Sequence, residues 1–488
     1  MPIDFTKPTD LQDAVVTVMG LGRFKQGSGI GAAKWLMRHG AQIVVTDLKS
    51  EADLKASVDL VTQWYEEYRK EYPDRDIYAP VFVLGEHREE DFENVQLVVK
   101  NPDVPKESAF VKLAEKNGVR VESDVSLFWH FYPHPICAVT GTRGKSTTTA
   151  LIGEMLKRVH PKTVVAGNIM HSPLEELDWM LTEEKPVPVA LELSSWLLEG
   201  LDHVKVGPEV AVLTNVSMDH LDRYESFDAY LAAKEIIFNT QSPSQKAVLN
   251  YDHEIVRKVG ERVKSRAFWF SAKPLPESVE GTYIAEDGTL HLRLGGTDRE
   301  ICHPQNWPCL QGEHNVQNAL AATLAAALAG VPDEGLCMSL RTFEGLQGRQ
   351  QTVREFDGVT YVNDTNATSP DAVVAALKRF ANDKKRVVLI VGGKAKGFSF
   401  DEMAAAIREH CKHVVYLEGS STAEIEQAVG TSVPSVNVSD MESAVLEAKK
   451  AASAGDIVLL SPGTASFGLF KNAYDRGGQF VEAVKNLK

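Results

Sequence analysis

The residues best equipped for chemistry form a short segment with the composition of a loop that binds nucleotide phosphates. Residues 139–149 read VTGTRGKSTTT and lie at the end of an apolar run. Gly141 and Gly144 would let backbone N–H groups close round phosphate oxygens. Lys145 would place a cation on the β and γ oxygens, and the hydroxyl of Ser146 could ligate Mg²⁺. The segment therefore predicts a strand, a phosphate loop and the N-terminus of a helix, whose dipole also favours anions.

Acidic and histidine side chains follow two further apolar runs. Glu192 lies at the end of one, and the other leads into residues 214–222, TNVSMDHLD, which contain His220. In an α/β sheet, ligands bind at the edge formed by the carboxyl ends of the strands. Glu192 is therefore placed where ligands bind, whereas a lone histidine such as His220 is more often structural or exposed. Lys234 lies further on in a helical pattern and, taken alone, favours the interpretation of a solvated helix lysine.

A glycine cluster near the N-terminus suggests a second kind of chemistry. Gly20-Leu21-Gly22 is followed by residues 27–32, GSGIGA, and Asp47 lies twenty residues after Gly27. This spacing matches the dinucleotide fingerprint, in which glycines let the backbone approach a pyrophosphate. An NAD oxidoreductase is therefore an alternative to an enzyme that uses a nucleoside triphosphate.

The apolar runs that position these residues alternate with helical patterns in three blocks. The expected strands are residues 14–19, 42–46, 81–84, 97–100 and 120–122, then 136–140, 164–166, 189–191 and 210–214, and finally 387–391, 413–417 and 457–460. An antiparallel stretch over 267–301 and a helix over 316–329 should close the second block. Strands alternating with helices predict the α/β class with parallel sheets. We expect three domains, 1–123, 124–342 and 343–488, of doubly wound or Rossmann-like type.

Composition narrows the classes of function. The net charge of -15 argues against a broad surface for nucleic acid or anionic membranes, which would need clustered Lys and Arg. The sequence has no apolar run of membrane-spanning length, and its first ten residues lack the apolar core of a signal peptide. We therefore expect a cytoplasmic protein. The five cysteines never form a CxxC pair, so neither a disulfide framework nor a zinc site is predicted.

The phosphate loop resembles the GTxGKST loop of Mur ligases and their folylpolyglutamate synthetase relatives, and the resemblance extends over nearly the whole chain. It implies a central domain of the P-loop ATPase type between two Rossmann-like domains. It also implies that ATP is bound by the loop residues Gly141, Thr142, Arg143, Gly144, Lys145, Ser146 and Thr147.

The same resemblance implies a catalytic centre with two Mg²⁺ ions. Ser146 and Glu192 would hold the ion associated with ATP, and His220 would hold the second. Lys234 matches a lysine that many of these ligases carbamylate with CO₂, which would convert a cation beside the metals into an anion. Asn168, in the segment GNI, would lie near the second metal and the acceptor substrate.

Two further segments resemble nucleotide-binding parts of the family. In residues 312–321, GEHNVQNALA, Asn318 would read the adenine, whereas Asn315 could equally be an ordinary helix cap. Arg349, in residues 345–349, would reach the γ-phosphate, and Asp364 would hold the ribose.

The substrate positions follow by the same resemblance. Gly20, Gly22, Asp47 and Lys49 would hold the UDP group, and Thr368, Lys396, Ser466 and Phe467 would hold the incoming amino acid. Two residues depart from the pattern of the glutamate-adding members. Asn366 stands where they usually have lysine, and Ala473 stands where an aromatic residue is usual.

Together these matches imply a monomeric, ATP-dependent ligase that adds D-glutamate to UDP-N-acetylmuramoyl-L-alanine through an acyl phosphate, in peptidoglycan precursor synthesis. The two departures keep an L-glutamate-adding relative open. The Rossmann-like first domain disfavours a folylpolyglutamate synthetase, and a binding protein that lacks amino-acid-dependent turnover remains a further alternative.

Overall fold

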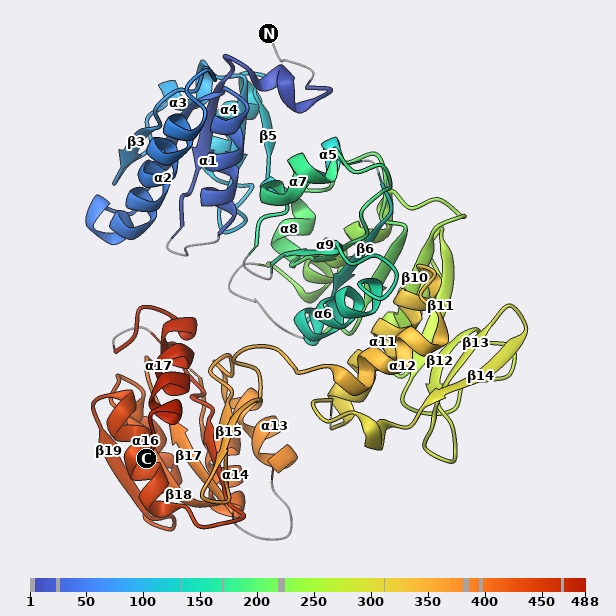
Figure 1. Ribbon diagram of the computed structural model, residues 1–488, viewed down its shortest axis with the longest axis vertical. Helices are drawn as coiled ribbons and strands as arrows, with labels where there is room; N and C mark the ends of the chain where they lie inside the picture. The colour runs from blue at the N-terminus through green and yellow to red at the C-terminus, as the bar shows by residue number, and fades with distance from the viewer. Residues whose placement is uncertain are drawn as a thin grey trace. The chain divides into compact units, whose positions relative to one another are not determined.

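The computed structural model describes residues 5–22, 27–132, 134–168, 171–217, 224–310, 312–380, 386–394, 398–466 and 469–488. Its strands form three sheets, of five, nine and six strands in chain order, and helices pack against each of them (Figure 1). The chain divides into two compact units. One contains residues 1–307 and 313–342 with the first two sheets, and the other contains 308–312 and 343–488 with the third. The expected α/β class, with one sheet in each of three sequence blocks, is confirmed.

The first sheet is parallel and has the strand order β3-β2-β1-β4-β5. Its strands are β1 Val15–Met19, β2 Gln42–Asp47, β3 Val81–Leu84, β4 Leu97–Lys100 and β5 Arg120–Glu122. The helices are α1 Ser28–Arg38, α2 Glu51–Glu71, α3 Glu90–Glu93 and α4 Ala109–Lys116. Strand order reverses at β1, so the crevice beyond its carboxyl end is the natural ligand position.

The second sheet has the order β14-β13-β12-β11-β10-β9-β6-β8-β7. Its strands are β6 Ile136–Thr140, β7 Val164–Gly167, β8 Val189–Glu192, β9 Val210–Leu213, β10 Lys246–Asn250, β11 Arg266–Ser271, β12 Gly281–Ile284, β13 Leu290–Leu294 and β14 Thr297–Cys302. The helices are α5 Asp124–Phe131, α6 Lys145–Leu156, α7 Leu174–Met180, α8 Ser195–Glu199, α9 Phe227–Asn239, α10 Glu254–Gly260, α11 Glu313–Leu328 and α12 Asp333–Thr342.

The prediction of an antiparallel stretch over 267–301 was wrong at its start. β11 is parallel to both of its neighbours, β10 and β12, and only β12 to β14 are antiparallel. The nine residues between β11 and β12 include Pro274 and Pro276, which favour a crossing loop over a tight hairpin. β10 was not predicted at all, although its short apolar centre is flanked by polar residues.

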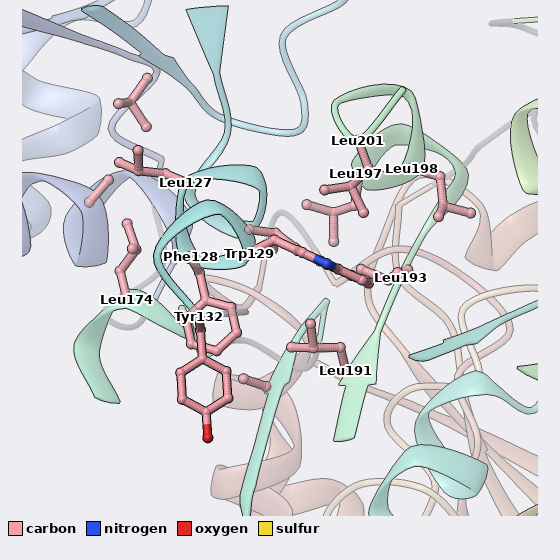
Figure 2. Close-up of a cluster of buried hydrophobic side chains, with 14 of the residues drawn as sticks. Leu127, Phe128, Trp129, Tyr132, Leu174, Leu191, Leu193, Leu197, Leu198 and Leu201 are labelled. Atoms are coloured by element: carbon pink, nitrogen blue, oxygen red, sulfur yellow. The ribbon is translucent and has the colours of Figure 1, made fainter. Parts of the chain in front are cut away.

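Buried apolar side chains fix the strand that carries the candidate acid. Figure 2 shows Phe128 and Trp129 of α5 and Leu174 of α7 in one cluster of buried side chains with Leu191 of β8. Two helices that precede β8 in sequence therefore contribute to the core around it. Burying this much apolar surface holds the strand firmly, and Glu192 at its end inherits that fixed position.

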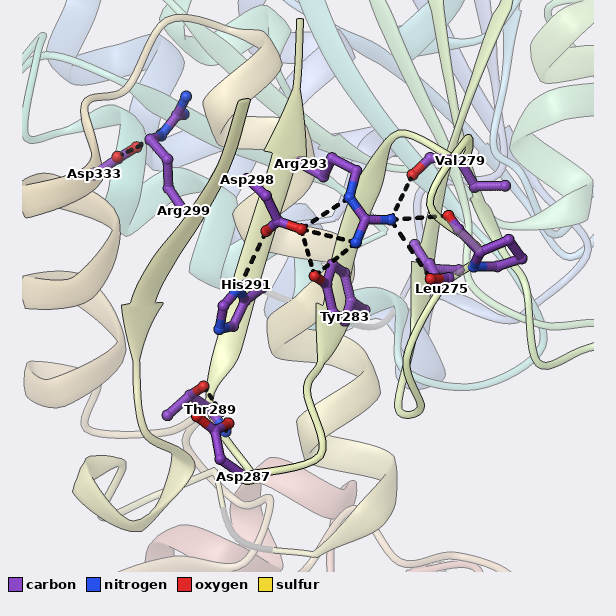
Figure 3. Close-up of polar contacts among 11 residues, drawn as sticks. Leu275, Val279, Tyr283, Asp287, Thr289, His291, Arg293, Asp298, Arg299 and Asp333 are labelled. Atoms are coloured by element: carbon purple, nitrogen blue, oxygen red, sulfur yellow. Dashed lines mark hydrogen bonds and ion pairs between the residues drawn. The ribbon is translucent and has the colours of Figure 1, made fainter. Parts of the chain in front are cut away.

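A polar cluster organises the antiparallel end of the same sheet. The carboxylate of Asp298 accepts hydrogen bonds from the Tyr283 hydroxyl at 2.5 Å and from Arg293 Nε at 2.8 Å, and it lies 3.1 Å from His291 Nδ1 (Figure 3). Arg299 of β14 forms an ion pair with Asp333 of α12 at 2.7 Å. These contacts join the three antiparallel strands β12, β13 and β14 to one another and to α12.

The third sheet has the order β15-β16-β20-β17-β18-β19, with β15 antiparallel and the rest parallel. Its strands are β15 Gln351–Phe356, β16 Val359–Asn363, β17 Val387–Val391, β18 Cys411–Leu417, β19 Ser435–Val438 and β20 Ile457–Leu460. The helices are α13 Pro370–Phe380, α14 Asp401–His410, α15 Thr422–Val429, α16 Met441–Ala451 and α17 Ala473–Lys485. The central strands β16, β20 and β17 end side by side, which brings the loops after them together.

Candidate active site

The phosphate loop joins β6 to α6, as predicted, and its glycines are required by close contacts. Gly144 has φ +83°, and a Cβ there would lie 2.1 Å from Asn318 Oδ1. Gly141 has φ +144°, and its Cβ would lie 2.0 Å from Thr214 Oγ1. Neither position could hold a larger residue without displacing its neighbour, because such contacts are far inside van der Waals range.

Residues that follow β9 hold the loop in shape. Asn215 accepts hydrogen bonds from Thr142 N and from Arg143 N, both at 2.9 Å. Thr214 Oγ1 donates to the carbonyl of Arg143 at 2.7 Å. β9 is the parallel neighbour of β6, so the two loops leave the sheet at one edge. The sequence did not assign this role to Thr214 or Asn215, although their place after a neighbouring strand was a usable signal.

The candidate phosphate ligands lie on the first turn of α6. Lys145 Nζ donates to the carbonyls of Gly141 at 3.0 Å and Thr142 at 3.1 Å, so the ammonium group lies over the loop. Ser146 and Thr147 are only partly buried. The loop, the cation and the helix N-terminus together form an arrangement that binds nucleotide phosphates.

Glu192 ends β8, a strand that neighbours β6 in the sheet. β8 pairs with β6 so that Glu192 lies opposite Val139, and Asn168 Nδ2 donates to Glu192 Oε1 at 3.2 Å. Glu192 Oε2 is buried and has no hydrogen-bond partner among the described residues. A buried carboxylate oxygen without a donor is costly, and a hard cation such as Mg²⁺ would satisfy it.

Only some of the other predicted metal ligands lie among the described residues. His220 belongs to residues 218–223, outside the described residues. Within the described ranges, no group of three or more His, Cys, Asp or Glu side chains is arranged to hold a metal. Oxygen donors of other types do lie nearby, because Ser146 is the second residue of α6, the helix after β6, and Asn168 contacts Glu192. The described residues therefore fit part of a magnesium site.

Lys234 lies under the phosphate loop, and the interpretation of a solvated helix lysine was wrong. Its side chain is only 1% exposed, and Nζ donates to the Gly141 carbonyl at 2.9 Å. The ammonium group also lies 4.5 Å from the ring centroid of Tyr230, one turn earlier on α9. The apolar surroundings of α9 and the loop above it bury the whole side chain.

Asn318 of α11 lies against the same loop and contacts Asn315 of its own helix. Asn318 Nδ2 donates to Asn315 Oδ1 at 3.4 Å, and Asn318 Oδ1 is the atom that approaches Gly144. α11 begins at Glu313, so Asn315 is the third helical residue. The alternative that Asn315 caps the helix was therefore wrong.

The predicted UDP-binding residues gather at the carboxyl ends of β1 and β2. Asp47 Oδ2 accepts hydrogen bonds from Leu21 N at 3.0 Å and Gly22 N at 3.4 Å, and Asp47 Oδ1 accepts one from Lys49 N at 3.0 Å. Gly20 has φ +90° and packs against Asn101. The carboxylate of Asp47 thus shapes the glycine turn. Residues 23–26 of that turn lie outside the described residues.

In the smaller unit, the loops after β16, β20 and β17 contact one another. Gly463 N donates to the Ala367 carbonyl at 2.8 Å, and Lys394 N donates to the Ala465 carbonyl at 2.9 Å. These contacts bring the segments of Thr368 and Ser466 together, and Ser466 is buried. Lys396 and Phe467 lie outside the described residues.

Asp364 follows β16 and is nearly completely buried. Its Oδ2 accepts a hydrogen bond from the Ser461 hydroxyl at 3.0 Å, and its Oδ1 accepts one from Gln350 N at 3.1 Å. Burial raises the pKa of Asp364 to about 7, although both hydrogen bonds oppose that rise. Arg349, the residue before Gln350, has an exposed side chain.

Sequence reasoning missed Arg476, a fully buried guanidinium near these loops. Nη2 donates to the Thr365 carbonyl at 2.8 Å, Nε to Thr365 Oγ1 at 3.1 Å, and Nη1 to the Thr464 carbonyl at 3.3 Å. Burial lowers the pKa of Arg476 to about 10. The side chain joins the segment after Asp364 to the segment before Ser466. The sequence offered only one hint of this role, which is the position of Arg476 on the first turn of α17.

The fold and the phosphate loop define an α/β protein built to bind nucleotide phosphates. Residues 139–326 match the Mur ligase middle domain, and residues 348–463 match the Mur ligase, glutamate ligase domain. The chain belongs to the Mur ligase family.

Individual relatives match along almost the full length. The chain is 40% identical over 478 residues to the UDP-N-acetylmuramoylalanine–D-glutamate ligase of Roseiflexus sp., covering 96% of this chain and 98% of the relative. It is 35% identical over 478 residues to the enzyme of the same name from Koribacter versatilis, covering 98% of each. These named relatives are ligases, which favours ligation over the oxidoreductase alternative.

Solved structures support the fold at lower identity. A UDP-N-acetylmuramate-alanine ligase from Thermotoga maritima aligns with a TM-score of 0.57 and 19% identity, covering 97% of this chain and all of that one. A pseudomurein peptide ligase from Methanothermus fervidus gives 0.56 and 17%, covering 98% of this chain and 100% of the other. No helix in the described ranges has the length and apolarity to cross a membrane.

Proposed function

We propose that the protein is an ATP-dependent ligase that joins D-glutamate to UDP-N-acetylmuramoyl-L-alanine, releasing ADP and phosphate. The observation that carries the proposal is the phosphate loop, packed against Asn318, with Glu192 at the end of the neighbouring strand β8 holding a buried oxygen that has no partner among the described residues. The printed names of the relatives from Roseiflexus and Koribacter supply the choice of substrates. The proposal places the reaction in cytoplasmic peptidoglycan precursor synthesis.

The proposed reaction has two steps. The alanine carboxylate attacks the γ-phosphorus of ATP, ADP leaves, and an acyl phosphate forms. Lys145 and Arg349 would offset the charge that develops on the transferred phosphoryl oxygens. The amine of glutamate then attacks the acyl carbon, and phosphate leaves as the amide bond forms. Because an acyl phosphate reacts readily with water, the site must exclude solvent before the second step.

Two Mg²⁺ ions, held by Ser146, Glu192, His220 and a carbamylated Lys234, would supply further charge stabilisation when bound. We assign the adenine to Asn318 with Asn315, and the ribose to Asp364. The UDP group would lie at Gly20, Gly22, Asp47 and Lys49, the acceptor near Asn168, and glutamate near Thr368, Lys396, Ser466 and Phe467. The proposal includes three domains, 1–123, 124–342 and 343–488, in a monomer with small-molecule substrates.

One assay tests the reaction and the amino acid. Phosphate release from ATP is measured with UDP-N-acetylmuramoyl-L-alanine and D-glutamate, L-glutamate or no amino acid. We expect turnover with D-glutamate only. Turnover with L-glutamate would instead support the second candidate, for which the departures at Asn366 and Ala473 are the specific observation. Phosphate release that ignores the amino acid would contradict both.

The role of Lys145 is tested by Lys145→Ala in the same assay. Removing the cation over the loop should lower kcat by about 100-fold or more, since groups that stabilise transition-state charge contribute on that scale. Lys157→Ala is the matched control, because Lys157 lies just after α6 and forms an exposed pair with Glu154. Equal activity of the two variants would exclude Lys145 from the reaction.

Carbamylation of Lys234 makes a separate prediction. Lys234→Ala should lose activity, and added short carboxylates should restore part of it by supplying the missing anion. Lys234→Arg keeps a cation under the loop but cannot form the carbamate, so it should also be inactive. Full activity of either variant would rule out a required carbamate.

A further inference from the structure

The turn that carries Arg349 packs against the segment that carries Asp364. Arg349 N donates to the Leu346 carbonyl at 3.0 Å, which closes a tight turn. Gly348 within this turn has φ +71°, and a Cβ there would lie 2.7 Å from Thr365 Cγ2. The turn therefore packs directly on the residues that follow Asp364.

Asn366 forms two hydrogen bonds to the same turn. Its backbone N–H donates to the Gly348 carbonyl at 2.9 Å, and its side-chain Nδ2 donates to the Gln347 carbonyl at 3.3 Å. Two adjacent carbonyls of the turn are thus satisfied by one residue. The amide group of asparagine supplies a hydrogen-bond donor, and its short side chain keeps that donor close to its own backbone.

Gln350 fastens the other end of the turn in a strained conformation. It has φ +48°, a region that residues other than glycine rarely adopt, at a cost of about 1 kcal/mol or more. Its backbone N–H donates to Asp364 Oδ1 at 3.1 Å, and its side-chain Oε1 accepts from Arg379 Nη1 at 2.5 Å. A strained residue persists only where its surroundings hold it, and here a carboxylate and a guanidinium do so.

We infer that Gln350, Asn366 and Arg379 are positioning residues that hold the Arg349 turn against the carboxylate of Asp364. Arg379 is partly buried near the end of α13, and its guanidinium also packs 4.9 Å from the ring centroid of Phe380. It fixes Gln350, and Gln350 in turn donates to Asp364. The inference rests on the proposed roles of Arg349 and Asp364 toward ATP. It gives Asn366 a structural role in place of a direct contact to the amino acid.

Arg379→Met tests the contact in the full-length enzyme. Small losses of position near reacting groups cost up to about 100-fold in rate, so kcat/KM for ATP should fall by about tenfold or more. The KM for the UDP substrate should not change, because its proposed site is on the first sheet. Arg379→Lys keeps a donor for Gln350 Oε1 and should recover most of the loss. Lys378→Met, which removes an exposed cation from the same helix, should stay within about twofold of the parent.

A double-mutant cycle shows whether the effect passes through Gln350. If Arg379 acts on the turn through this contact, Gln350→Ala and Arg379→Met together should cost no more than either alone. Gln350→Gly relieves the strain at φ +48° but keeps the backbone donor to Asp364. It should therefore lose less than Gln350→Ala. Additive losses in the cycle would overturn the inference.

The affinity of the enzyme for ATP in the presence of Mg²⁺, measured by calorimetric titration, separates this inference from the proposed function. If the parent enzyme ligates glutamate but Arg379→Met matches Lys378→Met in both turnover and ATP affinity, the inference fails while the function stands. If no ligation is found but Arg379→Met still weakens ATP binding and Arg379→Lys restores it, the function fails while the inference stands. Thermal unfolding identifies any variant that fails to fold. If Arg379→Met does not fold, the turnover and the ATP affinity of Arg379→Lys decide the outcome.

Discussion

Asp364 is the residue whose environment most directly opposes its proposed use. The ionised carboxylate is the stronger acceptor for a ribose hydroxyl, yet burial raises the pKa of Asp364 to about 7. The hydrogen bonds from Ser461 and from Gln350 N favour the charged form and limit the rise. Burying this carboxylate lowers the stability of the folded chain but places a charged group where a ligand would bind, as is common at functional sites.

Asp364→Asn should make the smaller unit more stable near pH 8. The folded pKa lies above the unfolded value of about 4, so the folded protein holds the extra proton and loses stability as pH rises from about 4 to 7. The amide removes that loss, and even about 1 kcal/mol would raise Tm by about 2 to 4 °C. Thermal unfolding at pH 5 and pH 8 measures the effect. A variant that is less stable than the parent at pH 8 would contradict it.

At the scale of elements, the phosphate loop is set by the packing of α11 on α6. Asn318 of α11 occupies the space in which a side chain at position 144 would lie. Thr214 and Asn215, after β9, hold the other side of the loop. The loop geometry therefore depends on one helix and one strand that are distant in sequence.

Gly144→Ala should weaken ATP binding by about tenfold or more, because the new Cβ would lie 2.1 Å from Asn318 Oδ1 at φ +83°. Gly330→Ala is the matched control. Gly330 has φ +94°, but no atom of the part of the chain that the structure describes lies within 4 Å of its Cβ position, so it reports the backbone strain alone. Titration of ATP compares the two. Equal affinities would show that contact with Asn318 does not shape the loop.

At the scale of the whole molecule, one carboxylate of α7, in the second block of the larger unit, joins that helix to α1 in the first block. Asp178 accepts hydrogen bonds from Trp35 Nε1 at 2.9 Å and Arg38 Nη1 at 2.7 Å, and lies 2.8 Å from His39 Nε2. Burial acts to raise the pKa of Asp178, but the bonds to His39 and Arg38 outweigh it and lower the pKa to about 2. The junction between α1 and α7 is therefore strongest when this carboxylate is charged.

Asp178→Asn should lower the free energy of unfolding of the larger unit by about 1 to 3 kcal/mol at pH 7, the range for charge-assisted hydrogen bonds. Because the folded pKa lies below the unfolded one, the contribution is present above about pH 4 and is lost as pH falls toward 2. The difference between variant and parent should therefore shrink at pH 3. Asp59→Asn, in an exposed pair with Lys55, is the control. A difference that does not depend on pH would exclude an ionic origin.

Local patterns were enough to predict much of this chain. The strand, loop and helix of residues 136–156 follow from an apolar run, two glycines and a lysine, whose meaning depends on neighbours a few residues away. The parallel strands β1 and β4 were predicted for the same reason. β16, by contrast, was missed because Thr360 and Asn363 interrupt its apolar pattern, although the strand lies between two neighbours in the sheet.

Other features depend on partners that the sequence does not place. Lys234 resembles any helix lysine until α9 packs beneath the phosphate loop, and Arg476 resembles a surface residue until two loops close over it. Asn315 resembles a cap until the helix is seen to begin at Glu313. The sequence by itself thus determined the class of fold and the identity of the phosphate loop, since these arise from short-range patterns. Only the tertiary structure decided which charges are buried and which turns are clamped, because burial and hydrogen bonding are set by segments that meet only in space.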